Sequence, residues 1–290
     1  MGYLYAFVAF LFIGSYLVPP RLATVRGLSF FPVMGLGMLL ADLFLWDSLQ
    51  NLWADPMWFW GSMLSGLLWA CGQGLGNMAL EEISLAKAAV FFNFNSFVNI
   101  VVGLVMFHEA TGFRAYFLLL SGGVLLFLGA WWVARVTASP AKEGNLKRGL
   151  LLSLAAGLFW GLYFAPMRAL QVWYPRAQLT PMDALSGMIL GGALAALLLA
   201  FLPKPGRWAW RNILLGCGSA GLWVFGTAGF LLAIQSLGLS RAVPIVNSNT
   251  LVYAGWSLFV FKEFPLREWK KISAGTLIVV GGVILMAFSK

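Results

Sequence analysis

Amide and hydroxyl side chains form a cluster within two otherwise apolar runs, residues 85–107 and 242–261. The members are Asn93, Asn95, Ser96 and Asn99 in the first run and Asn247, Asn249, Thr250 and Tyr253 in the second. An amide group both donates and accepts hydrogen bonds, which suits the recognition of hydroxyl groups. Because an unbonded polar group is costly in hydrocarbon, each side chain must face a partner helix or a wet cavity.

The spacing of these residues divides them between two helix faces. Asn95 and Asn99 are four residues apart and share a face, whereas Asn93 points elsewhere. The same spacing separates Asn249 and Tyr253 from Asn247, which lies on another face. We expect one face to line a pocket and the other to bond a neighbouring helix. A second interpretation stays open, in which all these groups only join helices together.

Aromatic residues accompany polar ones in two further runs. Trp69, Gln73 and Asn77 follow one another at four-residue spacing, and Trp223 and Thr227 do the same in a later run. A flat indole ring covers the apolar face of a sugar ring, while the amides bond to its hydroxyls. This combination suits a neutral polyol.

Two tyrosines precede prolines at matching places in the chain, Tyr16 before Pro19 and Tyr163 before Pro166. A proline inside a helix frees a carbonyl and bends the axis, which is useful at a gate, although a proline can also simply end a helix. We therefore predict Tyr16 and Tyr163 as gate or wall residues. The candidate substrate-binding residues are Trp69, Gln73, Asn95, Asn99, Trp223, Asn249, Tyr253, Tyr16 and Tyr163.

Few charged groups lie within the apolar runs. Asp42 is the one carboxylate well inside a run, so it is the candidate for proton coupling; an interfacial cap or an ion pair is the alternative. Glu109 and Glu263 both close apolar runs, and we expect each to tie a helix end to a neighbouring loop. Lys87 and Arg241 begin helices, where surface anchoring is expected in preference to anion binding.

The elements that must position these residues are membrane helices. Apolar residues make up 61% of the chain and charged residues 10%, unlike the roughly 45–50% and about 25% of soluble domains. Ten apolar runs are long enough to span a bilayer. They lie at about 3–19, 28–46, 57–79, 85–107, 113–134, 149–170, 182–202, 212–234, 242–261 and 270–288.

The chain also repeats itself. Residues 69–109 align without a gap on residues 223–263, with eleven identical pairs at an offset of 154. Duplicated apolar halves are typical of carriers that rock one half against the other. Five helices per half would insert the second half upside down. We predict a first five-helix repeat over 1–138, a short cytoplasmic linker over 139–148 and an inverted repeat over 149–290.

Lysine and arginine set the predicted orientation. Fourteen of the 19 fall in the loops after odd-numbered helices and five on the other side, so the richer side is cytoplasmic and both termini lie outside. The net charge of +9 is thus a topology signal and an attraction to lipid headgroups, and no nucleic-acid partner is expected.

Enzymatic motifs are absent from the sequence. Cys71 and Cys217 have no metal-type spacing around them, His108 is the one histidine, and no nucleophile motif occurs, so neither an enzyme nor a metal or cofactor is expected. A purely structural membrane partner is disfavoured by the amides that are paired across the repeat.

Four segments carry a resemblance to a known family. They are LLWACGQ (Leu67–Gln73), FWGLYFAPMR (Phe159–Arg168), GLSRAVPI (Gly238–Ile245) and FVFKE (Phe259–Glu263). The chain resembles the drug/metabolite transporter superfamily of ten-helix type, within it the glucose/ribose porter branch, and is also similar to rhamnose–proton symporters. The resemblance implies an inverted five-plus-five bundle with a central site and proton-coupled sugar uptake.

These observations predict a secondary transporter of the bacterial inner membrane that moves a neutral sugar or related polyol by alternating access. Its partners would be a small-molecule substrate, the lipid bilayer and protons, in a monomer or homodimer. The alternative is an exporter of amino acids or other small metabolites, whose charged substrates call for buried opposite charges. Mid-span lysine and arginine are absent from the chain, and only Asp42 comes close among the acids.

Overall fold

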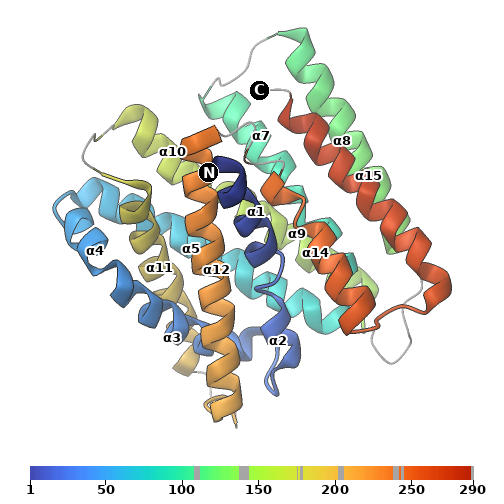
Figure 1. The fold of residues 1–290 in the computed structure, drawn as a ribbon, viewed down its shortest axis with the longest axis horizontal. Helices are drawn as coiled ribbons and strands as arrows, with labels where there is room; N and C mark the ends of the chain where they lie inside the picture. The colour runs from blue at the N-terminus through green and yellow to red at the C-terminus, as the bar shows by residue number, and fades with distance from the viewer. Residues whose placement is uncertain are drawn as a thin grey trace.

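The computed structural model has helices as its regular secondary structure, with no strand among the residues that it describes (Figure 1). The described residues are 1–107, 112–136, 144–174, 176, 179–201, 206–237, 242 and 245–288. His108, Glu109, Arg241 and positions 139–143 of the predicted linker lie outside them. The division of the chain into two repeats and a linker therefore stays a prediction.

The first half of the chain begins with short helices and continues with long ones. Its elements are α1 (Gly2–Ile13), α2 (Val18–Leu22), η1 (Gly27–Ser29), α3 (Phe31–Asp42), η2 (Leu43–Leu45), α4 (Trp46–Trp53), α5 (Pro56–Glu82), α6 (Leu85–Phe92), α7 (Phe94–Phe107) and α8 (Phe113–Ala134). Side chains cap several helix starts and satisfy free backbone N–H groups there. Asp55 accepts from the Trp58 nitrogen at 3.3 Å, and Ser84 accepts from the Lys87 nitrogen at 3.3 Å.

The second half has a similar succession of elements. They are α9 (Leu146–Leu162), α10 (Phe164–Trp173), α11 (Pro181–Leu198), η4 (Leu199–Phe201), α12 (Trp210–Leu237), α14 (Thr250–Gly255), the π-helical η5 (Trp256–Val260), η6 (Leu266–Glu268) and α15 (Trp269–Ala287). Thr180 and Asp183 form a reciprocal capping box at the start of α11.

Eight helical stretches of the described residues are long and apolar enough to cross a membrane, which confirms the prediction of an all-helical membrane protein. They are Gly2–Leu22, Gly27–Trp53, Leu85–Phe107, Phe113–Ala134, Leu146–Trp173, Pro181–Phe201, Trp210–Leu237 and Leu266–Met286. Two of the ten predicted runs, 57–79 and 242–261, are not among the eight. The first forms the long helix α5, which carries Gln73 and Asn77, and the second is divided around α14. Ten crossings and an inverted repeat stay predictions.

Four of the predicted helices are interrupted within their length. Turns at residues 14–17 separate α1 from α2, Tyr163 separates α9 from α10, Asn93 separates α6 from α7, and turns at 248–249 precede α14. A broken helix leaves backbone polar groups without helical partners, which a membrane protein tolerates where the chain is buried or lines a cavity. The interruptions thus mark the interior of the bundle.

Helices α8 and α15 lie side by side along one edge of the molecule (Figure 1). Glycines bring them together: a Cβ on Gly129 would lie 2.8 Å from the Gly275 carbonyl oxygen, and one on Gly282 would lie 2.6 Å from the Gly122 oxygen. Small residues allow this close approach in lipid, where no hydrophobic force drives helices together.

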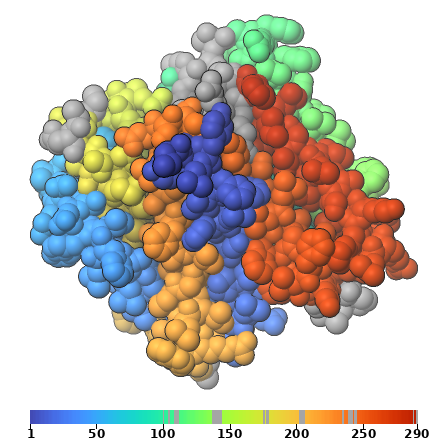
Figure 2. Space-filling model, viewed as in Figure 1, coloured from blue at the N-terminus to red at the C-terminus, as the bar shows by residue number. Residues whose placement is uncertain are grey.

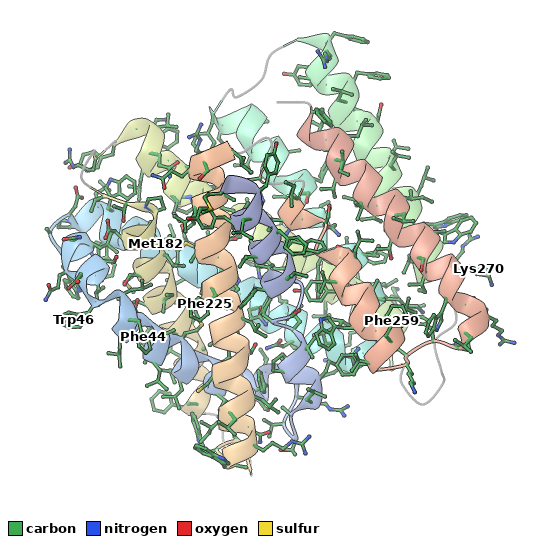
Figure 3. All side chains as sticks on the ribbon, in the orientation of Figure 1. Phe44, Trp46, Met182, Phe225, Phe259 and Lys270 are labelled. Carbon is green, nitrogen blue, oxygen red and sulfur yellow. The ribbon has the colours of Figure 1, made fainter. Side chains whose placement is uncertain are left out.

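Large apolar side chains cover the outer surface. Phe44, Phe225 and Phe259 point away from the bundle on three separate elements and are mostly exposed (Figure 3). Figure 2 shows α1 and α2 filling the surface between α12 and the C-terminal elements. Such an apolar surface fits a lipid environment.

Candidate functional site

A cavity of about 740 Å³ lies inside the bundle, between helices from both halves of the chain. Of the predicted site residues, Tyr16, Trp69, Asn95, Asn99, Tyr163, Trp223, Asn249 and Tyr253 line this cavity. Gln73 and Asp42 are not among its lining residues. The structure thus brings together eight of the predicted groups in one place, whereas their roles in binding stay predictions.

The two tryptophans pack against each other on the wall of this cavity. The ring centroids of Trp69 and Trp223 are 4.1 Å apart with 33° between the planes, and Phe31 meets the Trp69 ring edge-on. Trp69 and Trp223 are both buried. Trp69 is the residue through which α5 lines the cavity, and the α12 wall runs from Trp223 to Leu231. The remaining α5 residues beyond Trp69 lie outside the cavity wall.

Two reciprocal hydrogen bonds join the polar clusters of the two halves. The Asn93 amide donates to the Thr250 hydroxyl, and the Asn247 amide donates to the Ser96 hydroxyl at 2.8 Å. Asn93 and Asn247 are 154 residues apart, as are Ser96 and Thr250, so each bond is the counterpart of the other in the repeat. The residues predicted to bond a neighbouring helix do so, and they also line the cavity.

The remaining polar groups divide between the wall and the helix contacts. Asn95, Asn99 and Asn249 are half-buried on the wall, and Asn95 accepts from the Ser96 hydroxyl at 3.1 Å. The Tyr253 hydroxyl donates to the Ile13 carbonyl, so it ties α14 to the end of α1. Tyr253 therefore presents its ring to the cavity while its hydroxyl is already bonded.

Gln73 and Asp42 each bond elsewhere in the bundle. Gln73 is fully buried and donates to the Asn77 carbonyl oxygen at 3.0 Å. Asp42 is 4% exposed and accepts from the Ser186 hydroxyl at 2.7 Å, between α3 and α11. Proton coupling through Asp42 would therefore have to act through the packing of these helices, because the carboxyl group does not reach the cavity.

The cavity wall is nearly uncharged. Among the described residues that line it, Arg168 is the one charged side chain, and no carboxylate is present. In the described part of the chain no three His, Cys, Asp or Glu side chains come together as a metal site. The wall therefore offers amides, hydroxyls and aromatic rings, which bind polar groups by hydrogen bonding and stacking.

The cavity extends toward one end of the bundle. Its lining residues run along α7 as far as Phe107 and along α10 as far as Val172, at the ends of these helices. The loops that follow are on the predicted outer side.

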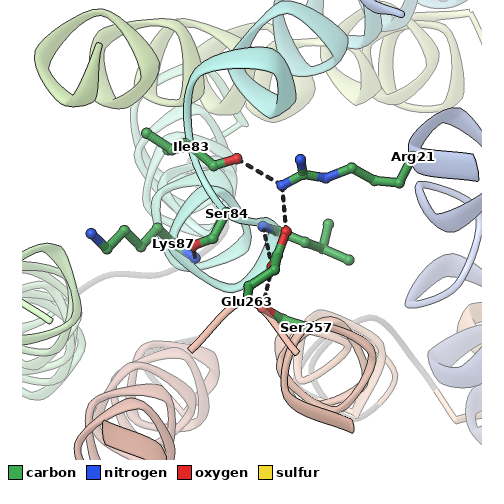
Figure 4. A network of polar contacts seen from close by, with 7 residues as sticks. Arg21, Ile83, Ser84, Lys87, Ser257 and Glu263 are labelled. Carbon is green, nitrogen blue, oxygen red and sulfur yellow. Dashed lines mark hydrogen bonds and ion pairs between the residues drawn. The ribbon is translucent and has the colours of Figure 1, made fainter. Parts of the chain in front are cut away.

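A polar network lies at the opposite end of the bundle (Figure 4). Arg21 contacts Glu263 at 2.7 Å and donates to the Ile83 carbonyl at 2.7 Å. The Glu263 carboxylate also accepts from the Leu85 backbone nitrogen at 2.9 Å and from the Ser257 hydroxyl. This carboxylate is 2% exposed and joins three separate segments.

Sequence reasoning found part of this network. Glu263 does tie a helix end to a neighbouring loop, as predicted. For Arg21 the sequence predicted only a contribution to the membrane orientation. Lys87, predicted as a surface anchor, is 1% exposed and lies beside Ser84 in this network (Figure 4). The repeat offered a signal for Arg21, because the match of 14–21 with 161–168 places it opposite Arg168.

Comparisons with known proteins agree with this picture. The model of a family described as "Sugar transport protein" matches residues 151–290. A "Putative sugar uptake protein" of Bacillus cereus is 24% identical over 231 residues, which cover 78% of each chain. The "Glucose uptake protein GlcU" of Bacillus subtilis is 22% identical over 236 residues, covering 79% of this chain and 78% of the relative.

A similar fold is known from a solved structure. A crystal structure of a protein 16% identical in sequence superposes with a TM-score of 0.62, covering 98% of this chain and 95% of the other. The matches confirm the predicted resemblance to sugar porters. With the apolar helices, they indicate a multi-pass membrane protein.

Proposed function

We propose that this protein moves a neutral sugar or related polyol across the cytoplasmic membrane by alternating access, with uptake coupled to protons. The observation that carries the proposal is a cavity lined by amides and a tryptophan pair, which extends toward one end of the bundle, with the Arg21–Glu263 network at the other. The relatives named as sugar and glucose uptake proteins support the same substrate class.

The chemistry of the wall favours a neutral, hydroxyl-rich substrate. Asn95, Asn99 and Asn249 each offer a donor and an acceptor, while Trp69 and Trp223 offer apolar ring surface. A sugar has this same division into hydroxyls and apolar ring faces. The volume of about 740 Å³ falls within the range of roughly 300–1,000 Å³ that is common for small-molecule sites.

The closed end supports alternating access. A carrier needs two conformations of similar energy that expose one site to opposite sides in turn. Arg21, Glu263 and the backbone of residues 83–85 join separate segments through contacts that a rocking motion can break. With the predicted orientation, the structure corresponds to a state that is open to the outside.

Arg168 favours one alternative, an exporter of amino acids or other small metabolites. Its guanidinium could pair with a substrate carboxylate, because it is the charged side chain of the described cavity wall. An amino acid would also need an acidic partner for its ammonium group, and the described wall provides none. A neutral substrate thus matches the wall better.

Counterflow in proteoliposomes tests the proposal. Vesicles loaded in turn with glucose, ribose, rhamnose, neutral amino acids or a cationic dye are offered the labelled solute in trace amounts. Exchange of one sugar, weakened by Trp69→Ala or Asn249→Ala, is the expected result. Exchange confined to amino acids or the dye would overturn the sugar hypothesis. Cys71→Ser, at a lipid-exposed position away from the cavity, serves as the control.

A further inference from the structure

Gln73 and Asn77 lie between the cavity and the closed end. Both are on α5, four and eight residues beyond Trp69 in the direction of Ile83, whose carbonyl binds Arg21. At 1.5 Å per residue they are about 6 Å and about 12 Å along the helix from Trp69. A substrate passing from the tryptophan pair to the Arg21 network would travel alongside them.

These two side chains have hydrogen-bonding capacity that is not used. Gln73 is 0% exposed and Asn77 is 2% exposed, and the Gln73 amide donates to the Asn77 carbonyl at 3.0 Å. Within the described part of the chain, the Gln73 carbonyl oxygen and the Asn77 amide nitrogen have no partner. If the nitrogen and oxygen of both amides are exchanged, the pair still has one free acceptor and one free donor.

A structural role explains this pair poorly. Polar residues that hold membrane helices together bond from one helix to another. The bond between Gln73 and Asn77 joins two turns of a single helix, so it contributes nothing to the packing of α5 against its neighbours. Burying an unpartnered polar group costs about 1–3 kcal/mol. Such a cost is expected where another conformation supplies the missing partner.

We propose that Gln73 and Asn77 bind the substrate on the cytoplasmic half of its path, once Trp69 and Trp223 separate and the Arg21–Glu263 contact opens. The free carbonyl accepts a hydrogen bond and the free amide donates one, so together they suit a hydroxyl group, which does both. The pair thus selects a hydroxyl-bearing substrate at its exit from the central cavity. This inference rests on the proposed function.

The test compares the two faces of the membrane. Half-saturation for sugar exchange is measured in right-side-out and inside-out vesicles for the wild type, Gln73→Leu and, as a matched control on the outer cavity, Asn99→Leu. Gln73→Leu should raise the half-saturation concentration about tenfold at the cytoplasmic face, as expected for one lost hydrogen bond of about 1.4 kcal/mol. At the outer face it should stay within about twofold, and Asn99→Leu should show the opposite preference.

The outcomes separate the inference from the function. A wild type that exchanges no sugar overturns the proposed function and the inference with it. Sugar exchange that Gln73→Leu alters equally at both faces, or at neither, overturns the inference alone and leaves the pair as a structural feature or a site for buried water.

A second variant covers the case in which Gln73→Leu fails to fold. Gln73→Cys in a background of Cys71→Ser and Cys217→Ser is exposed to a membrane-impermeant maleimide on either face. Labelling from the cytoplasmic face during exchange is expected. An active transporter in which position 73 is never labelled from that face overturns the inference.

Discussion

Neutralising Glu263 should release the closed end of the bundle. The carboxylate is buried and takes contacts from Arg21 at 2.7 Å, from the Leu85 nitrogen at 2.9 Å and from the Ser257 hydroxyl. In Glu263→Gln the amide oxygen can still accept one of these bonds. The ion pair with Arg21 is lost, however, and the guanidinium keeps its contact with the Ile83 carbonyl alone.

The size of the effect follows from these contacts. A hydrogen bond to a charged group contributes about 1.5–3 kcal/mol. Because the contact is present only while this end is closed, its loss acts on the balance between conformations. A change of about 1.4 kcal/mol is tenfold in an equilibrium constant, so the open form should gain at least about tenfold relative to the closed form.

Spin labels at the closed end measure this shift. Leu22 and Leu266 are exposed, lie close to Arg21 and Glu263 in the chain, and can be replaced by cysteine for labelling after Cys71→Ser and Cys217→Ser. Glu263→Gln should add a longer-distance component to the distribution between the two labels. An unchanged distribution in folded protein would refute the role of the network in closing this end.

Glu268→Gln is the matched control. Glu268 is also largely buried, but its two partners are exposed. The Lys271 Nζ atom lies 2.9 Å from the Glu268 carboxylate and the Arg267 Nε atom lies 3.7 Å from it. Exposed ion pairs contribute about 0–1 kcal/mol, so this variant should leave the distance distribution as in the wild type. A shift of equal size in both variants would mean that charge in this region, and not the Arg21 contact, sets the balance.

Three further predictions concern single residues. Trp69→Ala should weaken sugar exchange in counterflow by about tenfold or more, because it removes one of the two packed indole rings. Trp69→Phe should retain most of the exchange. Equal loss of exchange in the two variants would contradict a stacking role for Trp69. Asp42→Asn should abolish proton-driven accumulation but spare counterflow, and unchanged accumulation would remove Asp42 from coupling. Desolvation acts to raise the pKa of Asp55, but the hydrogen bonds from Arg176 and from the backbone nitrogens of Trp58 and Met57, together with the charge of Arg176, lower this pKa overall. Because the pKa of Asp55 is lower in the folded state, the carboxylate stabilises the fold above its unfolded-state pKa of about 3.9. This stabilisation is lost as the pH falls through the folded-state pKa. Thermal unfolding in detergent should therefore show that acid lowers the free energy of unfolding slightly, by less than about 1 kcal/mol, in the wild type but not in Asp55→Asn.

Much of the architecture was predictable because it depends on local patterns. Long apolar runs require helices in a bilayer, and the predicted runs at 85–107 and 113–134 coincide with the spans in the structure. The break at Asn93 was not predicted, whereas the one at Tyr163 lies just before Pro166, where the sequence left open a bend or a helix end. Helix interruptions depend on what a neighbouring helix offers to the freed backbone groups, and a single run of residues does not reveal this.

The site was predictable by residue type and only partly by position. Four-residue spacing placed Trp69, Gln73 and Asn77 on one face of α5, and the structure shows only Trp69 on the cavity wall. Helical spacing predicts which residues share a face, but it does not predict how far along the helix a cavity extends. Lys87, which its place at a helix start predicts as a surface anchor, is buried by the fold beside Ser84.

The paired bonds between Asn93 and Thr250 and between Asn247 and Ser96 have a mechanical consequence. Any operation that exchanges residues 93 and 96 with 247 and 250 turns one bond into the other. Because Asn93 and Ser96 are only three residues apart, the two bonds lie close together and near the axis of such an operation. When one half of a protein rotates against the other, residues near the rotation axis hardly move, while residues far from the axis move furthest. In the alternating-access cycle proposed above, the two amide bonds can therefore persist near the pivot, whereas the contact between Arg21 and Glu263 has to break.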